Sequence, residues 1–168
     1  MKKLLFIALL ASPLLSQACS FAPGFQAFTP AVASFEAKVD GEHYALLPAP
    51  GIRIVRLARG TAAAGGMCGG IGQLTLELDW PRSSVYKLDE VGFYFRVLGG
   101  QQPDRIFPLS PVTGTVTGQR ARFFFIWQDG HPSAQRPLNL EVEVFAVNKG
   151  LEIGAPRSFR LTDEAPAR

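Results

Sequence analysis

Residue types that commonly carry chemistry are scarce in this 168-residue chain, which has two cysteines, two histidines and two methionines. So few histidines and cysteines exclude a closely spaced zinc-ligand set. Charged residues make up only 18% of the chain, and the arginines are scattered singly between strand-like residues. A surface that tracks nucleic-acid phosphates needs clustered basic residues. We therefore expect no nucleic-acid partner and no bound cofactor.

Uninterrupted apolar runs long enough to span a membrane are also lacking. The apolar stretch Leu4–Leu15 has 12 residues and contains Ser12 and Pro13. As a helix rising about 1.5 Å per residue, it is too short for a hydrocarbon core of about 30 Å. Because two lysines precede it and small polar residues follow, it predicts an export signal at residues 1–18. We expect a periplasmic or extracellular protein without a transmembrane span.

Two alternatives remain for Cys19, the first residue after a cleavage at Ala18. In an oxidising compartment, Cys19 and Cys68 predict a disulfide, which would stabilise the fold by about 4 kcal/mol in the chain-entropy model. The alternative is a lipid anchor on Cys19, which would leave Cys68 as a free thiol. Ser16 and Gln17 fit a lipidation signal poorly, since an aliphatic and a small residue are usual there. We prefer the disulfide.

The composition suffices for one folded domain. Hydrophobic residues make up 47% of the chain, which disfavours intrinsic disorder and provides for a sizeable core. Residues 1–18 contain two of the 17 basic residues and none of the 14 acidic ones, so their removal lowers the formal net charge from +3 to +1. The apparent basicity therefore belongs largely to the signal.

From residue 50 onward, apolar residues alternate with a period of two, which predicts β-strands. The strand-like runs lie at 52–58, 74–80, 91–98, 123–127, 138–147 and 159–161, and the run at 91–98 ends at Gly99-Gly100. Residues 106–107 and 112–116 resemble short edge strands between prolines. Within the first run the apolar face changes after Ile54, which indicates a β-bulge or a change of sheet. About seven short strands separated by turns predict an all-β, antiparallel β-sandwich.

Several of these strands resemble the fibronectin type III family. Residues 140–150, followed by Ala155-Pro156 and another strand, are similar to the family's last hairpin. Residues 76–81 are similar to its second strand with a core tryptophan, Trp80, and residues 92–97 to its third. The family usually has a corner tyrosine where this chain has Leu140, so the topology stays open. The resemblance implies that the third and sixth strands are neighbours, but it implies no common functional site.

The resemblance covers residues 50–162 and sets the predicted domain boundaries. A signal peptide at 1–18 is followed by a phenylalanine- and proline-rich extension at 19–49, the sandwich at 50–162 and a tail at 163–168. The extension is too aromatic for a solvated linker, and its Asp40-Gly41 pair predicts a small hairpin. The predicted core residues are Leu76, Leu78, Trp80, Phe93, Phe95, Phe125, Val142 and Val144.

Motifs for catalysis are weak. The glycine-rich segment 60–72 lacks the lysine of a phosphate-binding loop, and a strand instead of a helix follows it. The chain has no Gly-x-Ser-x-Gly motif. The alternative to a non-catalytic protein is a small envelope metal-binding protein or hydrolase. Its candidate residues are Asp40, His43, Asp129 and His131, which lie in two turns that would have to converge.

Apolar residues on the outer face of the third and sixth strands are the remaining candidate site. Tyr94, Leu98, Phe145 and Val147 would lie together there, and an exposed patch would indicate a partner surface. We expect the aromatic extension to cover this patch and the protein to be a monomer. The expected function is a non-catalytic exported interaction or structural module of the cell envelope, with an unidentified protein or envelope component as partner.

Overall fold

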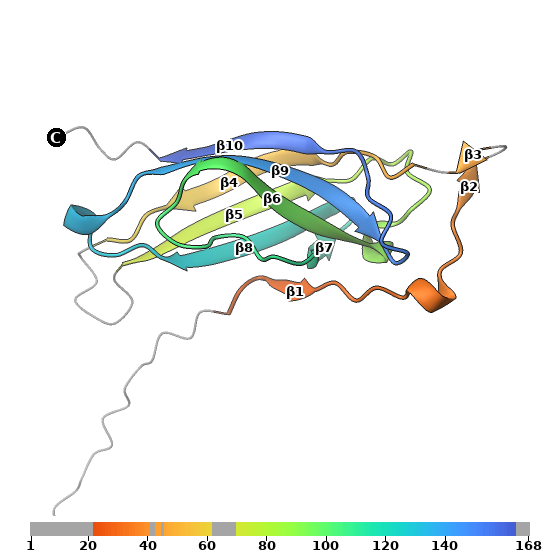
Figure 1. Ribbon diagram of the computed structural model, residues 1–168, viewed down its shortest axis with the longest axis horizontal. Coiled ribbons are helices and arrows are strands. Elements are labelled where there is room, and N and C mark those ends of the chain that lie inside the picture. The colour runs from red at the N-terminus through yellow and green to blue at the C-terminus, as the bar shows by residue number, and fades with distance from the viewer. Residues whose placement is uncertain (1–21, 41–42, 45, 62–69, 164–168) are drawn as a thin grey trace, which may run out of the picture.

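The computed structural model describes residues 22–40, 43–44, 46–61 and 70–163 (Figure 1). The strands are β1 (Phe25–Ala27), β2 (Val39–Asp40), β3 (His43–Tyr44), β4 (Gly51–Ala58), β5 (Ile71–Asp79), β6 (Val91–Gln101), β7 (Val112–Thr117), β8 (Arg120–Gln128), β9 (Leu138–Asn148) and β10 (Arg157–Asp163). Short 3₁₀ helices lie at η1 (Val32–Ser34), η2 (Leu88–Glu90) and η3 (Pro132–Ala134). Among these described residues, no helix is long and apolar enough to cross a membrane. The predicted all-β class is confirmed.

Eight of the strands form one antiparallel sheet that is nearly closed into a barrel, and β2 and β3 form a separate two-stranded sheet. The order of the larger sheet is β10-β9-β6-β7-β8-β5-β4, and β1 pairs with β7 as an eighth strand. The two ends of this order, β4 and β10, lie against each other. Arg59, which follows β4, forms an ion pair with Asp163 of β10 at 3.5 Å. The apolar face of the sheet is therefore enclosed by the curvature of the sheet itself.

The strand order contains a Greek key. β6, β7 and β8 are consecutive neighbours, and β9 returns to lie beside β6. The third and sixth strands of the main domain are thus paired, over the register from Val91↔Asn148 to Gln101↔Asn139. A two-residue turn joins β7 to β8, and its first residue, Gly118, adopts a φ of +60° that glycine tolerates without steric cost.

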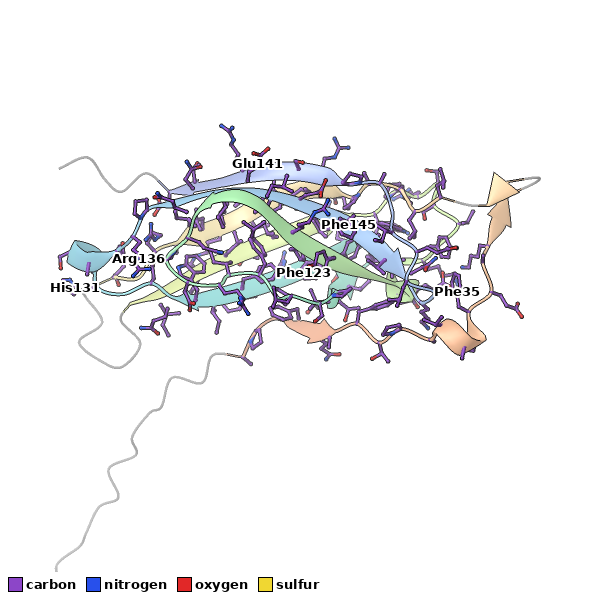
Figure 2. The ribbon with its side chains drawn as sticks, in the orientation of Figure 1. Phe35, Phe123, His131, Arg136, Glu141 and Phe145 are labelled. Carbon is purple, nitrogen blue, oxygen red and sulfur yellow. The ribbon has the colours of Figure 1, made fainter. Side chains whose placement is uncertain are left out.

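All eight predicted core residues are buried. Each is at most 4% exposed: Leu76, Leu78, Trp80, Phe93, Phe95, Phe125, Val142 and Val144. Phenylalanine rings fill the centre, where Phe123 makes edge contacts with Phe93 and Phe95 at 5.8 and 5.3 Å between ring centroids (Figure 2). Such contacts add to the free energy gained from burying the rings. Alternation along each strand therefore placed the core correctly.

Two predicted edge strands need correction. Residues 106–107 form no strand, although Ile106 and Phe107 are each only 4% exposed. Phe107 stacks on Phe95 with centroids 5.3 Å apart, so a loop inserts this ring into the core. The strand expected at 112–116 exists as β7, but it is not an edge because it pairs with β1, β6 and β8. Pro111 lies directly before β7 and therefore occupies no hydrogen-bonding position inside the strand.

The glycine pair at 99–100 does not end its strand. β6 continues to Gln101 through a register shift between Val97 and Gly99, and Gly100 has a φ of +104°. A Cβ on Gly100 would overlap the Asn139 carbonyl oxygen, so glycine allows close approach to β9. The irregularity predicted in the first strand is confirmed, since the β4–β5 register shifts between Ile54 and Arg56. Both features are β-bulges that bend their strands.

The N-terminal extension runs along the outside of the sheet from β1 through η1 to the hairpin of β2 and β3 (Figure 1). The predicted hairpin is confirmed by the pairs Val39↔Tyr44 and Asp40↔His43. β1 pairs with β7, and the Gly24 amide donates a hydrogen bond of 3.0 Å to the Phe124 carbonyl of β8. The extension is therefore part of the folded domain and not a linker.

Candidate functional site

The outer face of β4, β5 and β8 gathers five arginines, which we call the arginine face. They are Arg53 and Arg56 on β4, Arg120 and Arg122 on β8, and Arg82 in the turn after β5. Strand alternation explains the placement, because the intervening residues Leu76, Leu78 and Phe123 point into the core. The charged side chains must then point outward.

Glu77 of β5 lies at the centre of the arginine face. Cross-strand pairing places it between Arg53 of β4 and Arg122 of β8. Both guanidinium groups form ion pairs with Glu77, whose side chain is only 5% exposed. Arg122 Nε donates to Glu77 Oε1 at 2.9 Å. Hydrogen bonds from Arg122 and then Arg53 outweigh the effect of burial and hold the pKa of Glu77 below its ordinary value. Glu77 is therefore an ionised structural anchor and a poor proton donor.

The next row of the arginine face is more exposed. Arg120 Nε donates to Asp79 Oδ1 at 3.1 Å, and the two side chains are 60% and 55% exposed. Such a pair contributes about 0–1 kcal/mol to stability. Arg120 can therefore exchange Asp79 for another anion at little cost in folding free energy.

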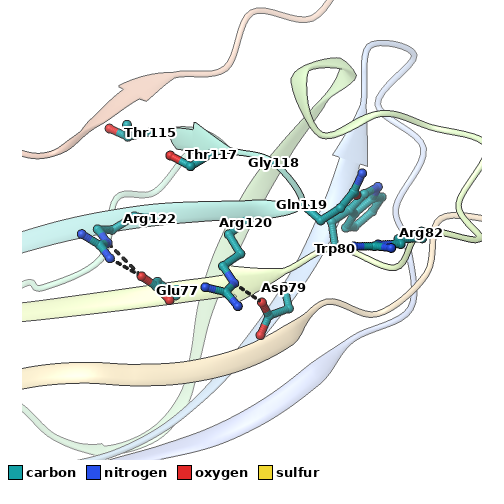
Figure 3. Close-up of a pocket in the computed structure, with 10 residues that line it drawn as sticks. All are labelled: Glu77, Asp79, Trp80, Arg82, Thr115, Thr117, Gly118, Gln119, Arg120 and Arg122. Atoms are coloured by element: carbon teal, nitrogen blue, oxygen red, sulfur yellow. Dashed lines mark hydrogen bonds and ion pairs between the residues drawn. The ribbon is translucent and has the colours of Figure 1, made fainter.

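A hollow of about 730 Å³ lies beside these pairs (Figure 3). Its polar lining includes Arg82, Arg120, Arg122, Thr115, Thr117 and Gln119. Trp80 also borders the hollow, but the ring is 4% exposed and its Nε1 donates to the Tyr86 carbonyl at 2.8 Å. The volume lies in the range of small-ligand sites, about 300–1,000 Å³. The hollow therefore offers guanidinium groups, hydroxyls and the paired carboxylates of Glu77 and Asp79, and no open aromatic ring.

A second polar cluster closes one end of the barrel around Asp129, whose side chain is fully buried. Arg59 Nε donates to Asp129 Oδ1 at 3.0 Å and to Oδ2 at 2.8 Å. The Gly60 amide donates to Oδ2 at 2.7 Å, and Trp127 Nε1 donates to Oδ1 at 3.1 Å. Burial disfavours the carboxylate, but these donors outweigh burial and hold the pKa of Asp129 below its ordinary value. Asp129 therefore joins β4 to the end of β8.

The four residues considered for a metal site are not brought together. The hairpin that carries Asp40 and His43 lies at one end of the molecule, and His131 lies at the other (Figures 1 and 2). His131 is exposed, and its Nδ1 lies 2.8 Å from Ser133 Oγ at the start of η3. The oxygens of Asp129 are occupied by Arg59 and its other donors. Within the described part of the chain, no group of three His, Cys, Asp or Glu residues could hold a metal ion.

The outer apolar patch of β6 and β9 is exposed only in part. Phe145 and Val147 are 7% and 4% exposed, whereas Leu98 is 49% exposed and Tyr94 is intermediate. Tyr94 packs on Phe145 with centroids 5.3 Å apart, and the Arg96 guanidinium lies 5.6 Å from the Phe145 ring. The four residues therefore do not form one open surface, and their role as a partner surface stays a prediction.

The extension contacts the outer surface of β6 near this patch. The Phe28 ring lies on Gly92, which is paired with Val147. The Phe35 ring lies on Gly150, and Phe25 reaches the core at 5.3 Å from Phe125. These glycines leave the space that the aromatic rings occupy. The aromatic content of the extension thus serves packing against the sheet.

The predicted disulfide and lipid anchor concern residues outside the described part of the chain. Cys19 and Cys68 both fall there, as does most of the glycine-rich segment 60–72. Gly60 is described and packs on Gly70, where an added Cβ would overlap the backbone. This close approach gives a packing reason for glycine at position 60, and Gly70 has a φ of +86° that favours glycine.

The arginine face was not anticipated from the sequence. The arginines are far apart along the chain, so they looked scattered. One signal was present, because Arg120 and Arg122 share a strand face, as do Glu77 and Asp79. The pairing of β5 with β8 was needed to bring the two sets together.

No known family model matches the chain, and comparison with curated proteins and with solved structures yields no match.

Proposed function

We propose that this protein is a non-catalytic exported module of the cell envelope or exterior that acts by binding. The observation that carries the proposal is the arginine face, where Arg82, Arg120 and Arg122 border an open hollow. The two buried carboxylates, Glu77 and Asp129, have lowered pKa values because arginines pair with them. A general acid at neutral pH needs a raised pKa, so these groups suit structure and not catalysis.

The proposed fold relationship is to fibronectin type III-like sandwiches. The Greek-key order, the pairing of β6 with β9 and the buried Trp80 support it. Leu140 occupies the position of the family's corner tyrosine and is 1% exposed, so it packs in the core instead. Sandwiches of this kind host adhesion and spacer roles, and the role must be argued from the site.

Cell fractionation combined with metal analysis tests the proposed function. We expect the natural chain, carrying a C-terminal tag, to be recovered from envelope or extracellular fractions without residues 1–18. We expect the purified protein to hold no stoichiometric metal and His131→Ala to behave like the natural protein. Cytoplasmic recovery of the intact chain, or a bound metal lost in His131→Ala, would contradict the proposal.

A further inference from the structure

We propose that the ligand of the arginine face is an anionic polysaccharide segment bearing sulfate, phosphate or carboxylate groups. This inference rests on the proposed function and names the chemistry of its partner. Arginine is suited to these groups, since its planar guanidinium can donate two parallel hydrogen bonds to one oxyanion.

The charge balance of the face supports an anionic partner. Five arginines face two carboxylates, Glu77 and Asp79, which leaves a formal excess of +3. Glu77 is shared between Arg53 and Arg122, and the side chain of each arginine is more than half exposed. Arg56 and Arg82 make no ion pair among the described residues. The excess is therefore open to solvent and not neutralised internally.

The spacing of the positive groups suits an extended ligand. The backbones of residues two apart on one strand, such as Arg120 and Arg122, are separated by about 7 Å. The guanidinium groups of Arg53 and Arg122, two strands apart, converge on Glu77. A single small ion could contact only one or two of these groups. A chain with a charge on successive units could contact several together.

The shape and the other lining residues favour a carbohydrate. Thr115 and Thr117 are exposed on β7 and line the hollow with Gln119, so hydroxyl and amide groups are available to polar ligand atoms (Figure 3). Single-stranded nucleic acid usually stacks on exposed aromatic rings, and Trp80 is buried. A bilayer is flat, whereas this surface is hollowed to a volume of about 730 Å³.

The test measures binding of a fluorescent dextran sulfate oligosaccharide to the natural mature protein, with uncharged dextran of equal length as control. The hollow variant is Arg82→Gln with Arg120→Gln, because neither change removes a partner of the buried Glu77. The matched variant is Arg157→Gln with Arg160→Gln on β10, which removes the same charge at exposed positions that do not line the hollow.

We expect the sulfated probe to bind and the uncharged one not to bind. Affinity should fall at least about tenfold in the hollow variant, as expected when charge-assisted contacts are lost, and change less than about twofold in the matched variant. Binding should weaken with added salt. Thr115→Val with Thr117→Val should weaken binding without changing the charge. Melting temperatures should show that all variants fold.

Three outcomes would overturn the inference. They are unchanged binding in the hollow variant, an equal loss in both arginine variants, and binding only to vesicles of phosphatidylglycerol and not to the oligosaccharide. These outcomes would remove the arginine face as the binding site, whereas the exported and non-catalytic nature of the protein is tested separately, by cell fractionation and metal analysis.

Discussion

The Phe28 ring lies on the outer surface of β6 at Gly92, in the space that a side chain at position 92 would fill. The Phe28 amide also donates to the Pro111 carbonyl at 3.0 Å, which fixes the approach of the segment. Glycine at position 92 thus joins the extension to the sheet, although the backbone there has no unusual φ.

Gly92→Ala should destabilise the protein by about 1–3 kcal/mol, because the new methyl group overlaps the Phe28 ring. In a Phe28→Ala background the same change should cost much less, since the overlapping ring is gone. Urea denaturation of the four proteins in this double-mutant cycle measures the coupling. Additive losses would show that Phe28 and Gly92 are not in contact.

Trp80→Ala should be severely destabilising, by about 3–5 kcal/mol, because it empties a large buried volume. Trp80 is 4% exposed and packs edge-on against Phe93 at 5.8 Å. Trp80→Phe should cost less, as it retains a ring and loses the Nε1 hydrogen bond to Tyr86. Thermal melts followed by circular dichroism measure both, and a spectrum dominated by helix would contradict the fold itself.

Acid should weaken the fold through Asp129. Its folded-state pKa lies below its ordinary value, so its contribution to stability is fully present above the unfolded pKa of about 3.9. The contribution is lost as the pH falls through the folded pKa. The free energy of unfolding, measured from pH 7 to pH 2, should decrease as Asp129 becomes protonated. Asp129→Asn should be less stable than the natural protein at pH 7, and its stability should depend less on acid. An equal pH dependence in both proteins would exclude this role.

The outer patch of β6 and β9 should divide into a packed and an open part. Phe145→Ser should cost about 3–5 kcal/mol, as for other large buried aromatic truncations, because Phe145 is 7% exposed. Leu98→Ser should stay within about 0.5 kcal/mol of the natural protein, because Leu98 is 49% exposed. If Phe145→Ser leaves stability unchanged and abolishes capture of a partner, the patch is an interface.

Intact mass spectrometry of the exported protein distinguishes the two states of Cys19. We expect a mass two hydrogens below that of the reduced chain from residue 19, which corresponds to a Cys19–Cys68 disulfide. A diacylglycerol adduct on Cys19, or two thiols that react with iodoacetamide under non-reducing conditions, would rule out the bridge.

Local sequence patterns determined the strands and their inward faces. Alternation in residues 74–80 and 138–147 placed Leu76 and Val142 in the core, because successive side chains on a strand point to opposite sides. The bulge near Ile54 also left a local signal, since the apolar face changes there. These features depend on neighbours within a few residues.

Only the tertiary structure decided which strands pair and what their outer faces gather. Glu77 and Arg122 are 45 residues apart in the chain and meet only because β5 pairs with β8. Phe107 is buried by a loop whose sequence resembles an edge strand, since packing against Phe95 outweighed local propensity. The pairing of strands and the closure of the sheet depend on contacts between residues far apart in the chain. Local periodicity does not specify these partners, so the barrel-like sheet and the arginine face form only in the folded chain.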